Sequence, residues 1–512
     1  MIEIKNLSIK VNDRYLVKNL SLNLNRNDKL AIIGEEGNGK STLLKCIINI
    51  CNYAEITGTI NLNGNRIGYL TQHIIEDYKD QKVFNYLFTD DNDYYSKINN
   101  LYKNLLALRI NDNILDKKIN VLSGGEKIKV AILKLLLDDN DAFLLDEPTN
   151  DLDIETLLWL ENFINKIDKP IIYISHDETL LSKTANMILH IESLKRKTEC
   201  KHTLLKIKYD EYVNLRFRTI IHQTQVHNFE VKELQKKEEK LKWQKQRVEF
   251  EQNNISRSDP HGGRLLKKKM HNIKSQEKKL ERIDIIEKPD PEESIYFEFE
   301  DIYVPNNKKI LNLSDFCLTI DNTILANDIR LEVYGGEHIC IIGKNGAGKT
   351  TLIRKVYNIL KNRDDIKVGY MPQNYNDVFY DYDNVLDFIT SNSRNKKVIT
   401  KARMYLGNMK FTSDEMTGKI DNLSGGSKAK LILVKLVFDK CNVLVLDEPT
   451  RNVSPLSNPV IRMILKDFNG TIVSVSHDRK YIEEVANKIY LLTANGLNLV
   501  EKEDFIENFI EK

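Results

Sequence analysis

The chain has 512 residues, which is enough for two or three domains that each bury a core. Its composition, 29% charged and 41% hydrophobic, is typical of a soluble protein, and a net charge of +2 excludes a uniformly basic or acidic surface. No segment reaches the ~20 uninterrupted apolar residues of a membrane span, and residues 1–10 lack the apolar core of a signal peptide. Six scattered cysteines without a CxxC pair argue against a disulfide framework and a cysteine-bound metal site, so we expect a cytoplasmic protein.

The first predicted elements include a short apolar strand that ends in AIIG and a glycine-rich loop, GEEGNGKST, at residues 34–42. The pattern GxxxxGK[ST] predicts a phosphate loop. Its backbone N–H groups surround a triphosphate, its lysine reaches the β- and γ-phosphates, and its hydroxyl ligates Mg²⁺. The loop residues expected to contact a nucleotide are Gly34, Gly37, Asn38, Gly39, Lys40, Ser41 and Thr42.

A later apolar strand, AFLLDE, ends in two adjacent carboxylates, Asp146 and Glu147. We expect Asp146 to hold Mg²⁺ and Glu147 to activate or orient a water that attacks the γ-phosphate. His176 follows the next strand, IIYIS, 30 residues after Asp146, where an imidazole can donate to the γ-phosphate and hold that water. Short strands that alternate with amphipathic helices predict an α/β fold, a mostly parallel sheet covered by helices.

Residues 209–291 differ in composition from residues 1–208, because they are charged, poor in Gly and Pro, and helical in character. A single break, NNISRSDPHGGR at 253–264, predicts two long antiparallel helices joined by a turn-rich tip. About 45 helical residues before the break would span roughly 65 Å. Residues 240–282 contain 13 Lys and Arg and 5 Asp and Glu, a net charge of +8, which favours a surface for a polyanion over an ordinary solvated coiled coil.

Residues 292–512 repeat the motifs of residues 1–208 in the same order. The second glycine-rich loop, GKNGAGKTT at 343–351, lies 309 residues after the first, and Gln373, LSGG, LDEPT and VSHD each lie 301 residues after their counterparts. Five ordered motifs at matched spacings predict a second domain with the same fold and chemistry. Its corresponding residues are Gly343, Asn345, Gly346, Ala347, Gly348, Lys349, Thr350, Thr351, Asp447, Glu448 and His477.

The ordered set of phosphate loop, Gln, LSGG, LDEPT and His resembles the ATP-binding cassette family in both halves of the chain. In that family two cassettes pair head to tail, and the LSGG of one caps the ATP held by the other. A serine hydroxyl and glycine N–H groups at a helix N-terminus suit a γ-phosphate. The resemblance implies two sites for ATP and Mg²⁺, with Gln72 and Gln373 also directed at the metal. One site joins Lys40, Ser41, Gln72, Asp146, Glu147 and His176 with Ser424, Gly425 and Gly426; the other joins Lys349, Thr350, Gln373, Asp447, Glu448 and His477 with Ser123, Gly124 and Gly125.

Two tandem cassettes joined by a long α-helical hairpin resemble the ABC-F subfamily, whose members act on ribosomes. The linker tip and LDEPTRNVSPLSNPVIR resemble the antibiotic-resistance members active against lincosamides, streptogramin A and pleuromutilins. The resemblance implies a monomer that pairs its own cassettes and contacts 23S rRNA and tRNA near the exit and peptidyl sites of the bacterial 70S ribosome. When ATP closes the cassettes, the tip would enter the exit site and dislodge the drug, and hydrolysis would release the protein.

The chain departs from the family pattern at both nucleotide sites. Glu35 and Glu36 introduce two acids into the first phosphate loop, beside a polyanion, which makes ATP binding there less favourable. Tyr15 fits the aromatic that stacks on adenine about 25 residues before the lysine, but its counterpart in the second cassette is Ile324. We therefore expect the two sites to differ in affinity.

The loop after LDEPT also differs between the copies. Asp151 and Asp153 of the first copy correspond to Asn452 and Ser454 of the second. In the family this loop faces the opposite phosphate loop. Ser454 can still cap the following helix, although Asn458 before Pro459 is an equally good start. We therefore expect the second copy to keep the cap and lose the charge, so that two working sites are coupled asymmetrically.

Three other functions share part of this pattern. A housekeeping ABC-F translation factor that rescues stalled ribosomes fits the same motifs. Gln and the serine of LSGG are 51 residues apart in both copies, so the first cassette lacks the arm insertion that some housekeeping members carry there. Only this spacing and the linker tip favour resistance. The ATPase subunit of a membrane transporter would need a membrane-spanning partner and no basic hairpin. DNA-repair and chromosome ATPases place their coiled coil inside one cassette, whereas here each cassette is complete.

Overall fold

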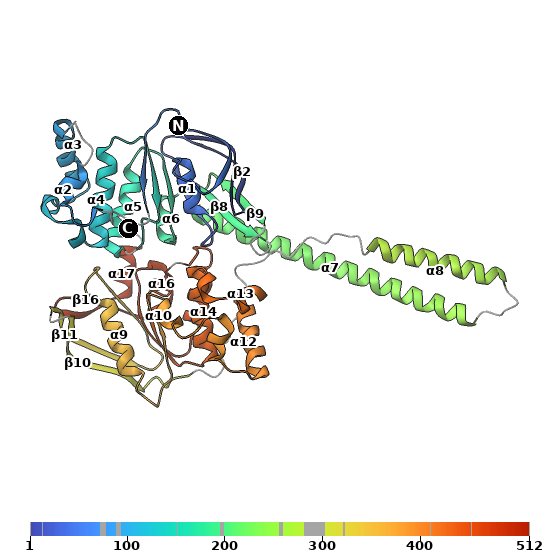
Figure 1. Ribbon diagram of the computed structural model, residues 1–512. Coiled ribbons are helices and arrows are strands. Elements are labelled where there is room, and N and C mark those ends of the chain that lie inside the picture. Colours follow the sequence, from blue (N-terminus) through green and yellow to red (C-terminus); the bar gives the residue numbers. More distant parts are fainter. Residues whose placement is uncertain are drawn as a thin grey trace. The chain divides into compact units, whose positions relative to one another are not determined.

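The computed structural model describes residues 2–12, 14–71, 78–88, 94–150, 152–194, 199–254, 260–280, 303–320, 323–409, 411–451 and 453–510 (Figure 1). The chain forms two compact units, one of residues 1–209 with 293–512 and one of residues 210–292. The larger unit contains both copies of the repeated sequence. None of the described helices is long and apolar enough to cross a membrane.

The first cassette is built on a six-stranded sheet in the order β5-β6-β7-β3-β8-β9. Neighbouring strands run parallel except at the β8–β9 edge. The central strands read KLAII, AFLLD and IIYI and are buried along their whole length, because helices cover both faces of a parallel sheet. The strands are β3 (Lys29–Ile33), β5 (Ile67–Leu70), β6 (Ala142–Asp146), β7 (Ile171–Ile174), β8 (Met187–Leu194) and β9 (Glu199–Leu205).

The second cassette repeats this sheet in the order β13-β14-β15-β12-β16-β17, again with one antiparallel edge pair, β16–β17. The α/β fold of two cassette sheets is therefore confirmed, and the phosphate loops follow the equivalent strands β3 and β12. The strands are β12 (His338–Gly343), β13 (Val368–Met371), β14 (Val443–Asp447), β15 (Thr471–Val475), β16 (Lys488–Thr493) and β17 (Gly496–Val500).

Each cassette also carries a small antiparallel sheet, whose strands alternate buried and exposed residues because one face is packed and the other meets solvent. The first contains β1 (Ile2–Val11), β2 (Arg14–Leu24) and β4 (Glu55–Asn61), and the second contains β10 (Lys309–Ile320) and β11 (Thr323–Tyr334). The strand β2 and its counterpart β11 pass next to the phosphate loops, since Leu16 and Leu325 lie within van der Waals contact of Gly39 and Gly348.

Helices complete both cassettes. Those of the first are α1 (Lys40–Ile47), α2 (Val83–Leu87), α3 (Tyr94–Ala107), α4 (Gly124–Leu137), α5 (Ile154–Lys166) and α6 (Glu178–Thr184). Those of the second are α9 (Lys349–Leu360), α10 (Asn376–Phe379), α11 (Val385–Thr390), α12 (Lys396–Asn408), α13 (Ser413–Thr417), α14 (Gly425–Phe438), α15 (Asn458–Lys466), α16 (Arg479–Val485) and α17 (Lys502–Phe509). Short 3₁₀ turns occupy Asp112–Asp116, Ile119–Val121 and Ile420–Asn422.

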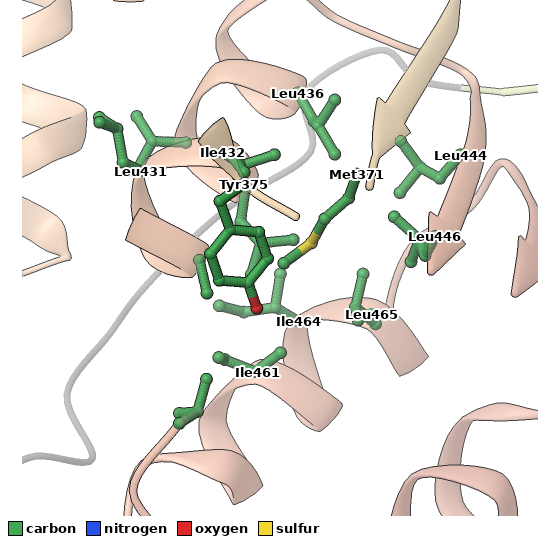
Figure 2. Packing of buried hydrophobic residues seen from close by; sticks show 14 of the residues in the cluster. Met371, Tyr375, Leu431, Ile432, Leu436, Leu444, Leu446, Ile461, Ile464 and Leu465 are labelled. Atoms are coloured by element: carbon green, nitrogen blue, oxygen red, sulfur yellow. The ribbon is translucent and has the colours of Figure 1, made fainter. Parts of the chain in front are cut away.

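The core of the second cassette holds the segment that follows Gln373. Figure 2 shows Tyr375 and Met371 among apolar side chains of α14, β14 and α15, including Leu431, Leu446 and Ile461. The Tyr375 hydroxyl donates to the Arg451 carbonyl at 3.0 Å, which ties this segment to the loop after LDEPT. Packing therefore links two loops that flank the second phosphate site.

The smaller unit is a helical hairpin of α7 (Tyr209–Asn254) and α8 (Pro260–Leu280). Leu241 and Val248 of α7 pack with Leu266 and Ile273 of α8, and an ion pair of 3.1 Å joins Lys245 to Glu277. The sequence predicted a turn-rich tip over residues 253–264. In the structure α8 already begins at Pro260, so helix extends into the predicted tip. Proline is tolerated in the first turn of a helix, where its missing N–H has no partner to lose.

Candidate active site

Both phosphate loops hold their lysine in the same way. Lys40 Nζ donates to the carbonyls of Gly34 and Glu35 at 2.8 and 3.0 Å, and Lys349 Nζ donates to those of Gly343 and Lys344 at 2.8 and 2.9 Å. Each loop ends in a glycine of positive φ, +86° at Gly39 and +94° at Gly348, directly before its helix. Burial lowers the pKa of both lysines, although neighbouring carboxylates oppose that effect. The ammonium groups are thus fixed inside the loops, where a phosphate would sit.

The Walker-type aspartates lie next to the loop hydroxyls, as predicted for a Mg²⁺ site. Asp146 accepts hydrogen bonds from Ser41 Oγ at 2.9 Å and from the Tyr69 hydroxyl at 3.1 Å. Asp447 accepts one from Thr350 Oγ1 at 3.5 Å, and its buried Oδ2 has no hydrogen-bond partner among the described residues. A hydroxyl and a carboxylate oxygen that lacks a partner fit a hard cation with oxygen ligands. Gln72 lies outside the described residues.

Glu147 lies in a cluster of donors at the end of β6. Its Oε2 accepts a hydrogen bond of 2.6 Å from Asn150, and its Oε1 lies 3.5 Å from His176 Nε2. Burial raises the pKa of Glu147, but His176, Asn150 and Lys40 outweigh that effect and hold it at about 2. The carboxylate is therefore ionised at neutral pH and able to accept a proton from water. Its φ of +50° is uncommon for a non-glycine residue, a geometry that tends to occur at functional sites.

Glu448 occupies the same position after β14, with φ +55°, but its surroundings differ. Its Oε2 accepts from the backbone N–H of His477 at 3.2 Å, and its Oε1 lies 3.8 Å from His477 Nε2. Complete burial raises the pKa of Glu448 to about 8, while burial and the charge of Lys349 lower the pKa of His477 to about 3. The second site therefore holds a neutral imidazole beside a largely protonated carboxyl group, unlike the first.

The second phosphate loop shares one cavity with the first cassette. This cavity has a volume of about 690 Å³ and brings Lys349, Gln373 and His477 together with Gly124 of the opposite LSGG. Asp153 also reaches this loop, since its Oδ2 accepts a hydrogen bond of 3.4 Å from the Asn345 N–H. The sequence-predicted residues that line the cavity are Gly124, His176, Asn345, Gly346, Gly348, Lys349, Thr350, Thr351, Gln373, Asp447, Glu448 and His477.

The first phosphate loop meets the second LSGG through Glu36, whose Oε2 accepts a hydrogen bond of 3.3 Å from the Gly426 N–H. A cavity of about 620 Å³ lies beside this loop and is lined by Gly37, Gly39, Lys40, Ser41, Thr42 and Glu147 among others. The serines of both LSGG motifs cap their own helices. Ser123 Oγ accepts from the Glu126 N–H and Ser424 Oγ from the Ser427 N–H, each at 3.2 Å.

The stacking role predicted for Tyr15 stays a prediction, and Tyr15 is not among the described residues that line the cavity at the first loop. Arg14 and Leu16 line the cavity at the first loop, and Thr323 and Leu325 line the one at the second, because side chains alternate along β2 and β11. Tyr15 points away from them, is 44% exposed, and lies under Lys18 Nζ at 5.6 Å from its ring centroid. An apolar contact from Leu16 or Leu325 is thus the common feature of both sites.

Two other predicted residues have structural partners. Asn38 is buried and its side-chain amide donates to the Ile191 carbonyl at 3.1 Å, which holds the loop against β8. Thr42 Oγ1 lies 3.5 Å from the Tyr53 hydroxyl. Neither contact is directed at the phosphate position.

The helix after the second LDEPT lacks the side-chain cap that was predicted. Asp153 caps α5 by accepting from the Thr156 N–H at 3.0 Å, whereas α15 begins at Asn458 after Ser457 without a capping hydrogen bond. The Ser454 hydroxyl instead accepts from the Leu456 N–H at 3.3 Å, within a turn. Pro459 in the first turn replaces the cap, because it has no N–H that needs a partner. Asp151 and Asn452 lie outside the described residues.

Sequence reasoning missed Tyr69, Asn150 and the contact of Glu36. Tyr69 and Tyr370 lie 301 residues apart, as do the motifs, so their repetition was visible. Asn150 is replaced by Arg451 at the same offset, a difference that indicates unequal surroundings of the two glutamates. The contact between Glu36 and Gly426 depends on how the two cassettes pack, and no nearby sequence motif predicts it.

Comparisons with known proteins agree with this geometry. The family model described as ABC transporter matches residues 17–150 and 326–451. ABC transporter F family member 2 of Arabidopsis thaliana is 28% identical over 75% of this chain and 54% of its own, and Ribosome protection protein VmlR of Bacillus subtilis (strain 168) is 27% identical over 97% and 87%. A crystal structure of the archaeal ribosome recycling factor aABCE1 with the stalk protein aP1 has the same fold, with a TM-score of 0.60, 17% identity and coverage of 96% and 89%.

Proposed function

The chain belongs to the ATP-binding cassette family, as an ABC-F protein and an ATPase, and on that premise we propose that it acts on the bacterial 70S ribosome. ATP would close the two cassettes, because each predicted site takes its phosphate loop from one cassette and its LSGG from the other. Hydrolysis would remove the bridging γ-phosphate and let the cassettes separate. This cycle belongs in the cytoplasm, where ribosomes are found.

The residues of this chain divide the chemistry between them. Lys40 and Lys349 would neutralise phosphate oxygens, and Mg²⁺, held through Ser41 with Asp146 and through Thr350 with Asp447, would supply further positive charge. Glu147 is ionised and can take a proton from water, whereas Glu448 must first lose its own proton. The two glutamates therefore differ in the direction of their pKa shifts, and we propose that this makes the two sites unequal in hydrolysis.

The observation that carries the ribosomal proposal is the surface of the α7–α8 hairpin. Apolar residues of α8 face α7, while Arg264, Lys267, Lys268, Lys269 and Lys274 are exposed. Two large side chains of α7, Trp243 and Phe250, are exposed by 72% and 70% and lie seven residues apart, on one face of the helix. Exposed aromatics among lysines suit RNA, because rings stack on bases and ammonium groups meet phosphates.

Within this function, protection from lincosamides, streptogramin A and pleuromutilins is the version that we favour. The linker-tip sequence supports it, as does the name of the relative VmlR, a ribosome protection protein that aligns over 97% of this chain. We propose that the tip enters the exit site, contacts 23S rRNA and tRNA, and displaces the drug. A housekeeping factor that rescues stalled ribosomes is the second candidate, because the same sequence motifs fit it.

Trapping the ATP-bound form tests the ribosomal proposal. Glu147→Gln together with Glu448→Gln keeps the shape of both side chains and removes the base, so closure persists while hydrolysis stops. The double variant should co-sediment with 70S ribosomes in ATP and not in ADP. Failure to co-sediment in ATP would contradict a ribosomal function. Expression in a susceptible bacterium then separates the two candidates, since raised inhibitory concentrations for the three drug classes are expected only for protection.

A further inference from the structure

Two buried arginines of the second cassette bind carboxylates of the first. Arg462 in α15 donates through Nη1 and Nη2 to the two oxygens of Glu178 in α6, at 2.5 and 3.1 Å. Arg479, the first residue of α16, donates through Nη2 to Glu161 of α5. The exposed fractions of Arg479, Arg462 and Glu161 are 0%, 3% and 4%, so these charges have left water and depend on their partners.

These two ion pairs are the same contact made twice. Glu161 and Arg462 are 301 residues apart, and so are Glu178 and Arg479, which makes them equivalent positions of the two copies. In both pairs, the α5 or α15 position of one cassette meets the α6 or α16 position of the other. The charges do not follow this repetition, because the first cassette supplies both carboxylates and the second supplies both guanidinium groups.

A third pair of equivalent positions also carries opposite charges in the two cassettes. Lys183 Nζ lies 3.9 Å from Glu161 Oε2, and its equivalent 301 residues later is Glu484, which accepts a hydrogen bond of 2.9 Å from Arg462 Nε. The supporting ion has therefore changed sign together with the residue that it supports. A fourth position has not changed, since Asp177 and Asp478 are both acidic, and Asp177 Oδ1 also accepts from Arg479 Nη2 at 3.3 Å.

The distribution of the charges determines which cassettes can pair. A cassette with Glu at the first position and Arg at the second would satisfy both contacts with any copy of itself. In this chain, two first cassettes would bring Glu161 against Glu178 twice, and two second cassettes would bring Arg462 against Arg479 twice. Like charges that meet in a buried contact are strongly unfavourable.

We propose that Glu161, Glu178 and Lys183, with Arg462, Arg479 and Glu484, form a charge code that selects the opposite cassette and rejects a second copy of the same cassette. Apolar contacts cannot make this distinction alone. Ile154 of α5, for example, packs into the core cluster of the second cassette, and an apolar side chain accepts many apolar neighbours. The partner that this face fits is the other cassette of its own chain.

The proposal can be tested in the full-length protein by exchanging the charges of equivalent positions between the two cassettes. One triple variant carries E161R, E178R and K183E, so that both cassettes present arginines; the other carries R462E, R479E and E484K, so that both present carboxylates. Each should lose at least about tenfold of the ATPase rate, because both composite sites need the opposite cassette. A chain with all six exchanges restores opposite charges among these six positions, although Asp177, which lies 3.3 Å from Arg479, is unchanged. It should recover to within about threefold of the unchanged protein.

Mixing the two triple variants provides a second measurement. Neither pairs its own cassettes well, but each cassette of one variant fits a cassette of the other. The mixture should therefore recover ATPase activity with a steep dependence on concentration and sediment as a one-to-one complex. A matched control, K480E with E483K, reverses an ion pair inside α16 that lies outside the code and should leave activity within about twofold.

Two results would overturn the proposal. One is that the variant with all six substitutions is folded, as judged by circular dichroism and thermal unfolding, and yet is as inactive as the triple variants. The other is triple variants that keep full activity. Should the triple variants fail to fold, the variant with all six substitutions decides, since a role that does not depend on opposite charges predicts no rescue. Ribosomes are absent from these assays, so their outcome does not depend on the ribosomal proposal.

Discussion

The carboxylate of Glu36 accepts a hydrogen bond of 3.3 Å from the backbone N–H of Gly426, so an acid of the first phosphate loop lies on the LSGG of the opposite cassette. Gly426 belongs to the first turn of α14, whose N–H groups attract negative charge. In an ATP-bound form the γ-phosphate would use the same donors. ATP bound in that way would therefore compete with Glu36 for one position.

Glu36→Gln should raise the ATP affinity of the first site, because the amide removes a negative charge that repels the triphosphate and binds Gly426 more weakly. We expect a decrease in Kd of about three- to tenfold, or roughly 1 kcal/mol. Titration with a fluorescent ATP analogue measures it, with the second site blocked by Lys349→Ala. The matched control is Glu35→Gln, an exposed neighbour with the same change of charge. Equal effects of the two substitutions would mean that the contact with Gly426 is unimportant.

Glu448→Gln should stabilise the nucleotide-free protein at neutral pH. Its folded-state pKa, about 8, lies above the ordinary value of 4.5, so ionisation of Glu448 costs stability that grows as pH rises from about 4.5 to 8. A neutral amide avoids that cost, and a melting temperature about 2–4 °C higher at pH 8 is expected for each kcal/mol regained. Thermal unfolding across pH 4–9 measures this, and the gain should vanish near pH 4.

Glu147→Gln should have the opposite effect. The folded-state pKa of about 2 lies below 4.5, so ionised Glu147 contributes stability that is fully present above pH 4.5 and is lost as pH falls towards 2. The amide loses the interactions with Asn150 and His176, and we expect a lower melting temperature at pH 7. Because the two substitutions are chemically identical, shifts of the same sign would show that the two sites do not differ.

Asp153→Asn should separate helix capping from coupling of the sites. Asparagine caps as well as aspartate, so the contact to Thr156 persists and stability changes little. The contact to the Asn345 N–H loses its charge, and binding of ATP at one site should then influence the other less, seen as a Hill coefficient closer to 1.

Asp153→Ala removes both contacts and should cost about 1 kcal/mol of stability as well. Ser454→Ala is the matched control at the equivalent position, where no helix is capped, and a cost below about 0.5 kcal/mol is expected. An equal loss of stability in the two alanine variants would mean that Ser454 does cap the following helix, as the sequence predicted.

Neutralising three lysines of α8, Lys267, Lys268 and Lys269, to glutamine should weaken ribosome binding and reduce its salt dependence. Each phosphate contact contributes a slope of about −0.7 to −0.9 to the logarithmic plot of affinity against salt concentration. Binding of the ATP-trapped variant is measured between 50 and 200 mM salt, roughly the range over which such contacts weaken.

The control for this experiment replaces Lys396, Lys397 and Lys401, which are exposed in α12 of the second cassette. The same loss of charge at that place should leave the slope unchanged. A slope that responds equally to both sets would reflect net charge alone and not a nucleic-acid contact of the hairpin.

Repetition and spacing predicted the two cassette sheets, because strands that are buried on both faces read as short apolar runs, as at β6 and β14. They also predicted that Lys349, Asp447 and Glu448 belong to one site. The spacing did not predict that Leu16, the neighbour of Tyr15 on β2, lines the cavity at the first loop. The different pKa values of Glu147 and Glu448 arise from burial and from neighbours such as Asn150, which only the folded chain assembles.

The inverted charges of Glu161, Glu178, Arg462 and Arg479 are visible in the sequence, although their contacts were not predicted. Comparison at the offset of 301 residues shows that acids are replaced by bases at the equivalents of positions 161 and 178, yet the offset alone does not say that these positions touch. Contact requires the packing of α5 and α6 against α15 and α16, which depends on how the cassettes meet. Equivalent motifs show which residues are repeated, whereas the charge code consists of equivalent positions whose charges are opposite.

Inversion of the charges also bears on the order in which the protein is made. Glu178 leaves the ribosome 284 residues before its partner Arg462, a delay of about 15–60 s at roughly 5–20 residues per second. During that time Glu178 has no arginine partner from its own chain. Neighbouring nascent chains on one messenger carry the same acidic face at high local concentration. If the proposed charge code holds, their mutual repulsion would keep the first cassettes apart until the arginines of the same chain emerge.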